Sequence, residues 1–452
     1  MNQKIRTLVS LLLVIATILS LGACVKTTPN ATSGENLASE TTTDGKAPVK
    51  NGEKQKVSVL CPGDEAKTRS LMVPLIEKFQ SENPDMKVEI IYKGWGDWIA
   101  TYASMFQAGT QPDVIMWWGK SLKDEYVAGK FVPLNDYVDP AVVAEIPKNM
   151  LDAVTVDGNQ YLLPVDSSGF LLYYRRDIFE QAGLDPNSPP KTWDELLHAC
   201  EQIAAKTEVY PLALPGKCGT EALHELIATF ISQSTGQPML DENNRICFNN
   251  AEGLAALDFV MKLMPYADPK STEYARGDTR QLFIDGKAAM TLGDGVWAVP
   301  GLQKTFGNNL NETVAGIAPP PAGPAGKYNV VGVNGWVIAQ KDNAEAAGRL
   351  IKFLYSPEAL FAYHSIYGST PYLQYEFDQE TFSYDFWKVA QEATFEYNGV
   401  LGIGKYHPVG SGIYAPLEPI WSEMIMGSIS TEEALQKIVK EIDGINGRYG
   451  IE

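Results

Sequence analysis

The residue types that most often perform catalysis occur in this chain, but the spacings that catalysis needs are incomplete. His224 and Glu225 begin like the helix of a zinc protease, yet the second histidine would have to stand at Ala228, and the chain has four histidines in all. Residues 119–121 match the end of a phosphate-binding loop, but the glycine required five residues earlier is Val114. We therefore expect neither a bound metal nor a cofactor.

Paired carboxylates are the catalytic arrangement that the sequence leaves open. Two facing acids can cleave a glycosidic bond, and the 55 Asp and Glu residues offer many pairs. Their separation depends on the fold, so the sequence does not select a pair. We predict that the chain is not an enzyme, and a surface enzyme that degrades glycans stays as an alternative.

Cys24 is the reactive residue whose surroundings define its chemistry. An apolar run from Leu8 to Ala16 follows a basic N-terminus and is too short to span a bilayer, which needs ~20 apolar residues. The segment from Leu21 to Cys24 resembles the lipobox of bacterial lipoproteins, where the thiol receives a diacylglyceryl group and becomes the new N-terminus after cleavage. We predict a lipoprotein signal peptide over residues 1–23 and a lipid on Cys24. The alternative is an ordinary signal peptide with an incidental cysteine.

The remaining composition predicts an exported, acidic body on a flexible tether. Residues 24–56 contain almost no large apolar side chains, so they cannot bury enough surface to fold. The net charge is −18, and a nucleic-acid partner is not expected because phosphate contacts need a basic surface. No CxxC spacing of a metal site occurs among the cysteines beyond Cys24, which are Cys61, Cys200, Cys218 and Cys247.

The first part of this body alternates strands with helices. Strands are predicted over residues 57–60, 87–92 and 113–117, with one helix ending at Asn83 and another over residues 97–108. This alternation predicts an α/β lobe with a parallel sheet.

The rest of the chain is predicted to cross between two lobes. An apolar stretch over residues 158–174 and a strand over 330–339, which follows a Pro/Gly-rich segment, are the expected crossings. Capping boxes predict helices that start at Thr192 and Ser430. The predicted lobes comprise residues 57–165 with about 330–372, and residues 166–329 with about 373–452.

Several short segments, in a fixed order, carry a family resemblance. The most specific segment runs from Tyr173 to Phe179 and continues to the capping box that begins at Thr192. Residues 286–290 and Trp297 follow in the same order. Together they resemble the extracellular solute-binding proteins of ABC sugar importers, the family that includes maltose-binding protein. The resemblance implies a periplasmic-binding-protein-like fold of type II, with two discontinuous α/β lobes joined by a hinge. Such lobes close on a ligand in the cleft between them.

A sugar site needs flat aromatic surfaces for C–H faces and polar groups for the hydroxyl rim. Trp117 ends the predicted third strand, where open parallel sheets place ligands, so we prefer it as a stacking residue over a core position. Trp118 would face the opposite side, so only one of the pair can face the cleft. Asp64 and Glu65 follow the first strand and could accept hydroxyl hydrogen bonds, or they could serve as a helix N-cap and first-turn acid.

The resemblance adds further ligand-binding candidates at the hinge and in the second lobe. These candidates are Asp166, Ser168, Asp294, Trp297, Asn334, Trp336 and Tyr414. Three other tryptophans, Trp193, Trp387 and Trp421, are predicted to be packing residues because they lie inside predicted helices or at a helix start.

These observations predict a binding protein that captures a mono- or oligosaccharide by lobe closure and delivers it to ABC transporter permease subunits. The lipid would hold it at the extracytoplasmic face of the cell membrane, and we expect a monomer. A receptor of the same fold for a non-sugar solute, a polyamine or a peptide, is the main alternative.

Overall fold

The computed structural model describes residues 54–94, 97–119, 122, 129–220, 222–400 and 410–451. The predicted signal peptide, Cys24 and nearly all of the predicted tether lie outside the described residues. Within them, each helix is too short or too polar to cross a membrane.

Strands from distant parts of the chain build the scaffold. They are β1 (Gln55–Pro62), β2 (Met86–Lys93), β3 (Val114–Trp118), β4 (Thr155–Val156), β5 (Asn159–Gln160), β6 (Leu163–Arg175), β7 (Tyr210–Ala213), β8 (Ala288–Gly295), β9 (Ala315–Ala318), β10 (Tyr328–Ile338) and β11 (Asn398–Val400). Apart from the β4–β5 pair, the described strands form one nine-stranded sheet with the order β2–β1–β3–β10–β6–β8–β7, to which β9 and β11 add at β6 and β10. β1 is parallel to β2 and β3, which confirms the predicted parallel sheet of the first part. β10 is antiparallel to β3 and β6, so the whole sheet is mixed.

The first lobe surrounds β1, β2 and β3. Its longest helix, α2, begins where the Asp64 carboxylate accepts a 2.9 Å hydrogen bond from the backbone N–H of Lys67. The helix buries one apolar face that includes Phe79 and ends at Asn83, as predicted. The helices of this lobe are α2 (Glu65–Glu82), α3 (Trp98–Gln107), α5 (Pro140–Glu145), α6 (Lys148–Val154), α13 (Ala344–Leu354) and α14 (Pro357–Tyr367).

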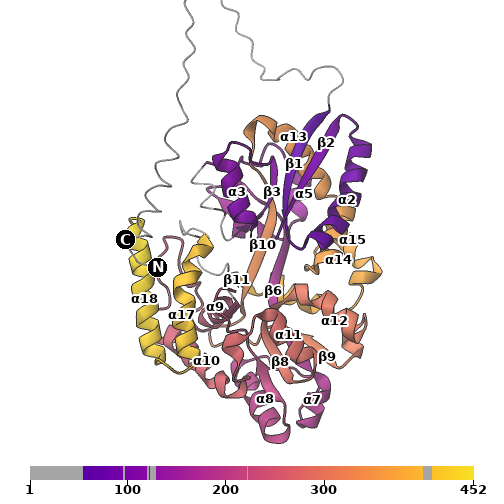
Figure 1. Ribbon diagram of the computed structural model, residues 1–452. Coiled ribbons are helices and arrows are strands. Elements are labelled where there is room, and N and C mark those ends of the chain that lie inside the picture. Colours follow the sequence, from indigo (N-terminus) through magenta and orange to yellow (C-terminus); the bar gives the residue numbers. More distant parts are fainter. Residues whose placement is uncertain are drawn as a thin grey trace, which may run out of the picture. The chain divides into compact units, whose positions relative to one another are not determined.

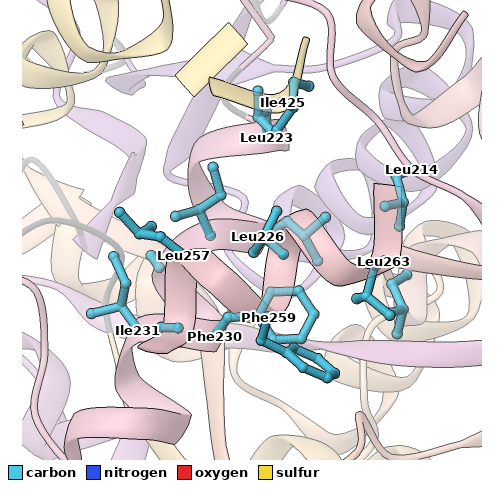
Figure 2. Close-up of a cluster of buried hydrophobic side chains, with 14 of the residues drawn as sticks. Leu214, Leu223, Leu226, Phe230, Ile231, Leu257, Phe259, Leu263 and Ile425 are labelled. Atoms are coloured by element: carbon cyan, nitrogen blue, oxygen red, sulfur yellow. The ribbon is translucent and has the colours of Figure 1, made fainter. Parts of the chain in front are cut away.

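The second lobe is rich in helices and is built around α9. All residues of α9 from Ala222 to Ser234 except Glu225 are buried, as befits an apolar helix at the centre of a lobe. Figure 2 shows Leu226 and Phe230 among side chains of the neighbouring core, which include Phe259. The helices of this lobe are α7 (Arg176–Gln181), α8 (Trp193–Lys206), α9 (Ala222–Thr235), α10 (Ala251–Leu263), α11 (Arg276–Ile284), α12 (Val299–Phe306), α16 (Phe386–Gln391), α17 (Tyr414–Ile425) and α18 (Thr431–Arg448).

Local signals for helix starts and core tryptophans are confirmed in the second lobe. The hydroxyls of Thr192 and Ser430 each accept a hydrogen bond from the backbone three residues later, which caps α8 and α18. The side chains of Trp193, Trp387 and Trp421 are buried in the cores, so they are packing residues as predicted.

Two long strands run side by side through both lobes, with β1–β3 and α13 at one end and α7 and α8 at the other (Figure 1). β6 leaves the core of the first lobe after Val165 and enters that of the second at Phe170. β10 makes the reverse passage between Val330 and Val333. A third crossing follows α14 and includes the short helix α15 (Gln374–Phe377). The exact lobe boundaries stay a prediction.

Candidate ligand-binding cleft

A cavity of about 600 Å³ opens where the two lobes face each other across β6 and β10. Residues from the crossing segments form its floor, and each lobe contributes one wall. The first-lobe wall consists of Asp64, Lys67, Trp118, Tyr363 and Tyr367, the floor of Asp166, Ser168, Val330 to Asn334 and Ser369, and the second-lobe wall of Glu225, Arg276, Arg280 and Trp297.

Asp166 is the buried acid of the floor. Its Oδ1 accepts a 2.9 Å hydrogen bond from Asn334 Nδ2, and its Oδ2 accepts from the hydroxyls of Tyr363 at 3.1 Å and Ser369 at 3.0 Å. Burial raises the pKa of Asp166, although these hydrogen bonds oppose the shift. Because the three donors come from β10, α14 and the chain that follows α14, one carboxylate connects two of the crossings to β6.

The first-lobe wall combines exposed charges with aromatic rings. Asp64 and Lys67 both stand on the exposed first turn of α2, where Asp64 also caps the helix. The rings of Tyr363 and Tyr367 stack with centroids 4.8 Å apart, and the Tyr367 hydroxyl lies 2.7 Å from that of Thr68. Burial raises the pKa of Tyr367 to about 12, so this phenol stays protonated and can donate a hydrogen bond.

The second-lobe wall contains a bidentate ion pair. Arg280 donates from Nε and Nη2 to the two carboxylate oxygens of Asp294 at 2.7 and 2.8 Å. The Asp294 side chain is completely buried, whereas 27% of the Arg280 side chain is exposed towards the cavity. Burial lowers the pKa of Arg280, but its hydrogen bonds to Asp294 outweigh that effect and leave the pKa above its ordinary value. Asp294 therefore supports the wall from behind without lining the cavity.

Arg276 is anchored in the same manner one helical turn earlier. Residues four apart on a helix share a face, so α11 presents Arg276 and Arg280 together. The Arg276 Nε donates to the carbonyl of Gly293 at 2.7 Å, and its Nη2 pairs with Glu225. Glu225 stands in the first turn of α9, where the helix dipole favours an acid.

Trp297 is held by a close approach to the backbone. It lies in a short 3-10 helix (Val296–Ala298) after β8, and a Cβ atom at Gly295 would overlap its indole ring. Its ring packs edge-on against Phe170 with centroids 6.1 Å apart, and the Arg276 guanidinium lies 5.7 Å from the indole centroid. Glycine at position 295 therefore allows the ring to lie at the cavity.

Only one tryptophan of the adjacent pair reaches the cavity, as strand alternation predicts, and it is Trp118. Trp117 is 2% exposed and packs against Trp98, Tyr102 and Phe131 in the first-lobe core. Trp117 is buried under helix α3, and the Trp98 ring of that helix also lies edge-on to Trp118, with centroids 5.1 Å apart.

The eleven predicted site residues therefore divide into two groups. Asp64, Trp118, Asp166, Ser168, Trp297 and Asn334 line the cavity. The other five do not: Trp117, Trp336 and Tyr414 are buried in cores, Asp294 is buried behind Arg280, and Glu65 is exposed on α2, where it pairs with Arg69. The role of each in ligand binding remains a proposal.

Several lining residues were not among the predicted candidates. In the sequence, Glu225 belongs only to an incomplete zinc motif. The spacing of Arg276 and Arg280 could have signalled one polar helix face, but nothing in the sequence pairs them with Glu225 or Asp294. The other lining residues outside the predicted set are Lys67, Tyr363, Tyr367, Ser369 and residues 330–333.

The cleft can hold a polar solute of modest size between rings and hydrogen-bonding groups. Within the described ranges, no three His, Cys, Asp or Glu side chains are grouped so that they could hold a metal ion. The acids Asp166, Glu225 and Asp294 are engaged with donors from the protein itself.

Comparisons with known proteins agree with this arrangement. The profile of bacterial extracellular solute-binding proteins matches residues 63–360. A binding protein of Brucella abortus is 27% identical over 298 residues, which cover 65% of this chain and 70% of the relative. The sn-glycerol-3-phosphate-binding periplasmic protein of Salmonella typhimurium is 24% identical over 399 residues, covering 81% and 86%.

The fold also matches solved structures. The cyclic alpha-maltosyl-1,6-maltose binding protein from Arthrobacter globiformis superposes with a TM-score of 0.73 at 18% identity, covering 87% of this chain and 99% of the other. This likeness confirms the predicted two-lobed α/β fold of type II.

Proposed function

Because the chain belongs to the family of bacterial extracellular solute-binding proteins, we propose that it captures a carbohydrate in its cleft and delivers it to an ABC transporter. The ligand would be a mono- or oligosaccharide, and the receiving partners would be the permease subunits in the membrane.

The observation that carries this proposal is the pattern of groups around the cavity. Trp118 and the stacked tyrosines of the first lobe face a cavity whose other wall carries Trp297. Rings on opposite walls suit the two C–H faces of a sugar, and the polar groups between them suit its hydroxyl rim. A cavity of about 600 Å³ lies within the range usual for small-molecule sites.

Lobe closure is the expected mechanism of capture. The two walls belong to separate cores, and the described part of the chain crosses between those cores three times, so the lobes can move as bodies about these connections. A ligand that contacts both walls binds the closed form better than the open form and shifts the equilibrium towards it.

We infer that no bond of the ligand is broken. A pair of acids for glycoside cleavage needs one carboxylic acid to donate a proton and one free carboxylate. Of the described acids that line the cavity, Glu225 pairs with Arg276, Asp166 accepts three hydrogen bonds, and Asp64 alone is left, so no second carboxyl group among them is available to form a pair with it. Incubating the purified protein with labelled glycans should give no products, and turnover that tracks the protein would favour the enzyme alternative.

We also propose that a lipid on Cys24 attaches the protein to the extracytoplasmic face of the cell membrane and that it acts as a monomer. The lipobox-like segment supports the first part. Metabolic labelling with palmitate should mark the wild-type chain but not Cys24→Ala, which should appear in the medium. Labelling of both chains would place the lipid elsewhere.

Trp297 provides the direct test of the site. A thermal-shift screen against mono- and oligosaccharides should identify a ligand, because a solute that binds only the folded state raises its stability. Calorimetry with that sugar should then show that Trp297→Ala loses about 2 kcal/mol of binding free energy, as central aromatic residues commonly do. Tyr210→Ala, which removes an exposed ring that does not line the cavity, is the matched control and should bind normally. Equal affinity of Trp297→Ala and wild type would place the sugar elsewhere.

A further inference from the structure

The arginines of the second-lobe wall are anchored in a way that leaves one nitrogen of each for a ligand. Arg276 makes its hydrogen bonds through Nε and Nη2, to Gly293 and Glu225. Arg280 uses the same two atoms for Asp294. Among the described residues, the hydrogen bonds of these two arginines run through Nε and Nη2 and not through Nη1, and both side chains line the cavity. Each guanidinium is therefore a fixed donor.

The charges of these donors are compensated inside the protein. Glu225 neutralises Arg276 and Asp294 neutralises Arg280. Counted over the described residues, three cations stand against four acids at the cavity: Lys67, Arg276 and Arg280 against Asp64, Asp166, Glu225 and the supporting Asp294. The cleft thus offers no net positive charge, and the whole chain carries −18.

Two acids of the cleft, Asp166 and Asp294, already accept hydrogen bonds from the protein on both carboxylate oxygens. Both oxygens of Asp166 accept hydrogen bonds from the protein, and both oxygens of Asp294 accept from Arg280. An ammonium group of a polyamine needs several acceptors, whereas Asp64, on an exposed helix turn, offers one carboxylate oxygen with no described donor.

We propose that Arg276 and Arg280, each paired with its own acid, determine the charge specificity of the cleft and select an uncharged saccharide. This inference rests on the proposed carbohydrate function. The Nη1 groups donate to hydroxyl or carbonyl oxygens of the ligand, while Glu225 and Asp294 cancel the charge that would otherwise attract a uronate or a sugar phosphate.

Burial of the ligand explains why pairing each arginine with an acid makes the cleft selective for uncharged ligands. An anionic ligand enclosed between the lobes loses its hydration and meets two guanidinium groups whose attraction is offset by adjacent carboxylates. An uncharged hydroxyl loses much less hydration and receives the same hydrogen bonds. The relative from Salmonella typhimurium that is named for sn-glycerol-3-phosphate offers a natural contrast, since its ligand is an anion.

The experiment is a binding panel in which neutral and charged probes are matched. Purified wild-type protein is titrated with glucose, galactose and maltose, with glucuronate, galacturonate and glucose 6-phosphate, and with spermidine. We expect binding of at least one uncharged sugar, and affinity at least about tenfold lower for its acidic counterpart. In Glu225→Gln the ratio of acidic to neutral affinity should rise about tenfold, because Arg276 then presents an uncompensated charge.

Two further variants separate this effect from structural damage. Glu242→Gln makes the same charge change at an exposed acid of the second lobe and should leave the ratio within about twofold of wild type, the usual scale for surface substitutions. Glu225→Gln combined with Arg276→Gln removes both charges and should return the ratio towards the wild-type value, whereas damage to the fold would not be reversed.

The outcomes distinguish the two proposals. Tighter binding of a uronate or sugar phosphate by wild type, or an unchanged ratio in Glu225→Gln, overturns the charge-specificity inference while leaving a carbohydrate receptor. Binding of spermidine alone, or of no sugar at all, overturns the carbohydrate function and the inference with it.

Discussion

Both walls of the cleft carry aromatic and charged side chains, but the charged side chains of the two walls differ in burial and in ion pairing. On the first-lobe wall, Asp64 and Lys67 are exposed to solvent on one helix turn. On the second-lobe wall, the charged side chains form ion pairs whose acidic partners are 14% exposed in Glu225 and fully buried in Asp294.

This difference separates charged side chains that are ordered in advance, on the second-lobe wall, from charged side chains that are exposed to solvent, on the first-lobe wall. Long side chains lose up to about 2 kcal/mol of rotamer entropy when they are immobilised. The ion pairs have already immobilised Arg276 and Arg280, so a ligand that contacts them does not have to order them. A contact with Lys67 must still order that side chain and displace its water. We therefore expect the second-lobe wall to contribute more to affinity.

The largest effect should follow from breaking the buried pair. Arg280→Ala leaves the carboxylate of Asp294 buried without its cation, and removing one partner of a buried ion pair usually lowers the free energy of unfolding by about 3–5 kcal/mol. Urea denaturation should show this loss. Replacing both partners, Arg280→Leu with Asp294→Leu, should recover part of it. Lys67→Ala is the matched control from the other wall, and its stability should stay within about 0.5 kcal/mol of wild type. A loss below 1 kcal/mol in Arg280→Ala would remove the contrast between the walls.

A smaller effect is expected on the first-lobe wall, where Asp64 has a structural role of its own. Asp64→Ala removes the acceptor for the Lys67 N–H at the start of α2 and should lower stability by about 1 kcal/mol. Asp64→Asn keeps an acceptor and should be close to wild type in stability. Comparing the two variants in denaturation and in sugar binding therefore separates capping from ligand contact. Equal stability of Asp64→Ala and wild type would show that the cap is dispensable.

The smallest effect should come from pH, and it tests a contact between α14 and β6, the strand that carries Asp166. His364 donates from Nε2 to the carbonyl of Val165 at 2.8 Å, and its Nδ1 is paired with Glu376. Burial lowers the pKa of His364, but Glu376 raises it more, so the net shift is upward. The stabilisation is therefore fully present below the ordinary imidazole pKa of about 6.5 and is lost as the pH rises through the higher value of the folded state.

Denaturation at a series of pH values from 6 upward measures this effect. The free energy of unfolding of the wild type should fall with rising pH, relative to that of His364→Gln combined with Glu376→Gln, which lacks the titrating pair. Parallel pH profiles for the two proteins would exclude His364 as the source.

Features that depend on neighbouring residues were predictable from the sequence. The caps at Thr192 and Ser430 form because a hydroxyl and a backbone N–H three residues apart meet in any helix start. The parallel strands β1, β2 and β3 follow from apolar periodicity and from the helices between them. Alternation likewise established that one residue of the Trp117 and Trp118 pair faces the cleft.

The tertiary structure decided which side of the strand is the cleft and how its charges are arranged. Trp118 lines the cavity, whereas Trp117 is buried against α3, and the amino-acid pattern around the pair is apolar on both sides. Arg276 meets Glu225 across 51 residues, and His364 meets Val165 across 199. Such contacts depend on how elements pack, and periodicity carries information only about a segment and its own face. The sequence therefore shows each polar residue of the cleft separately, but the pairing of each arginine with its acid arises only when the lobes fold.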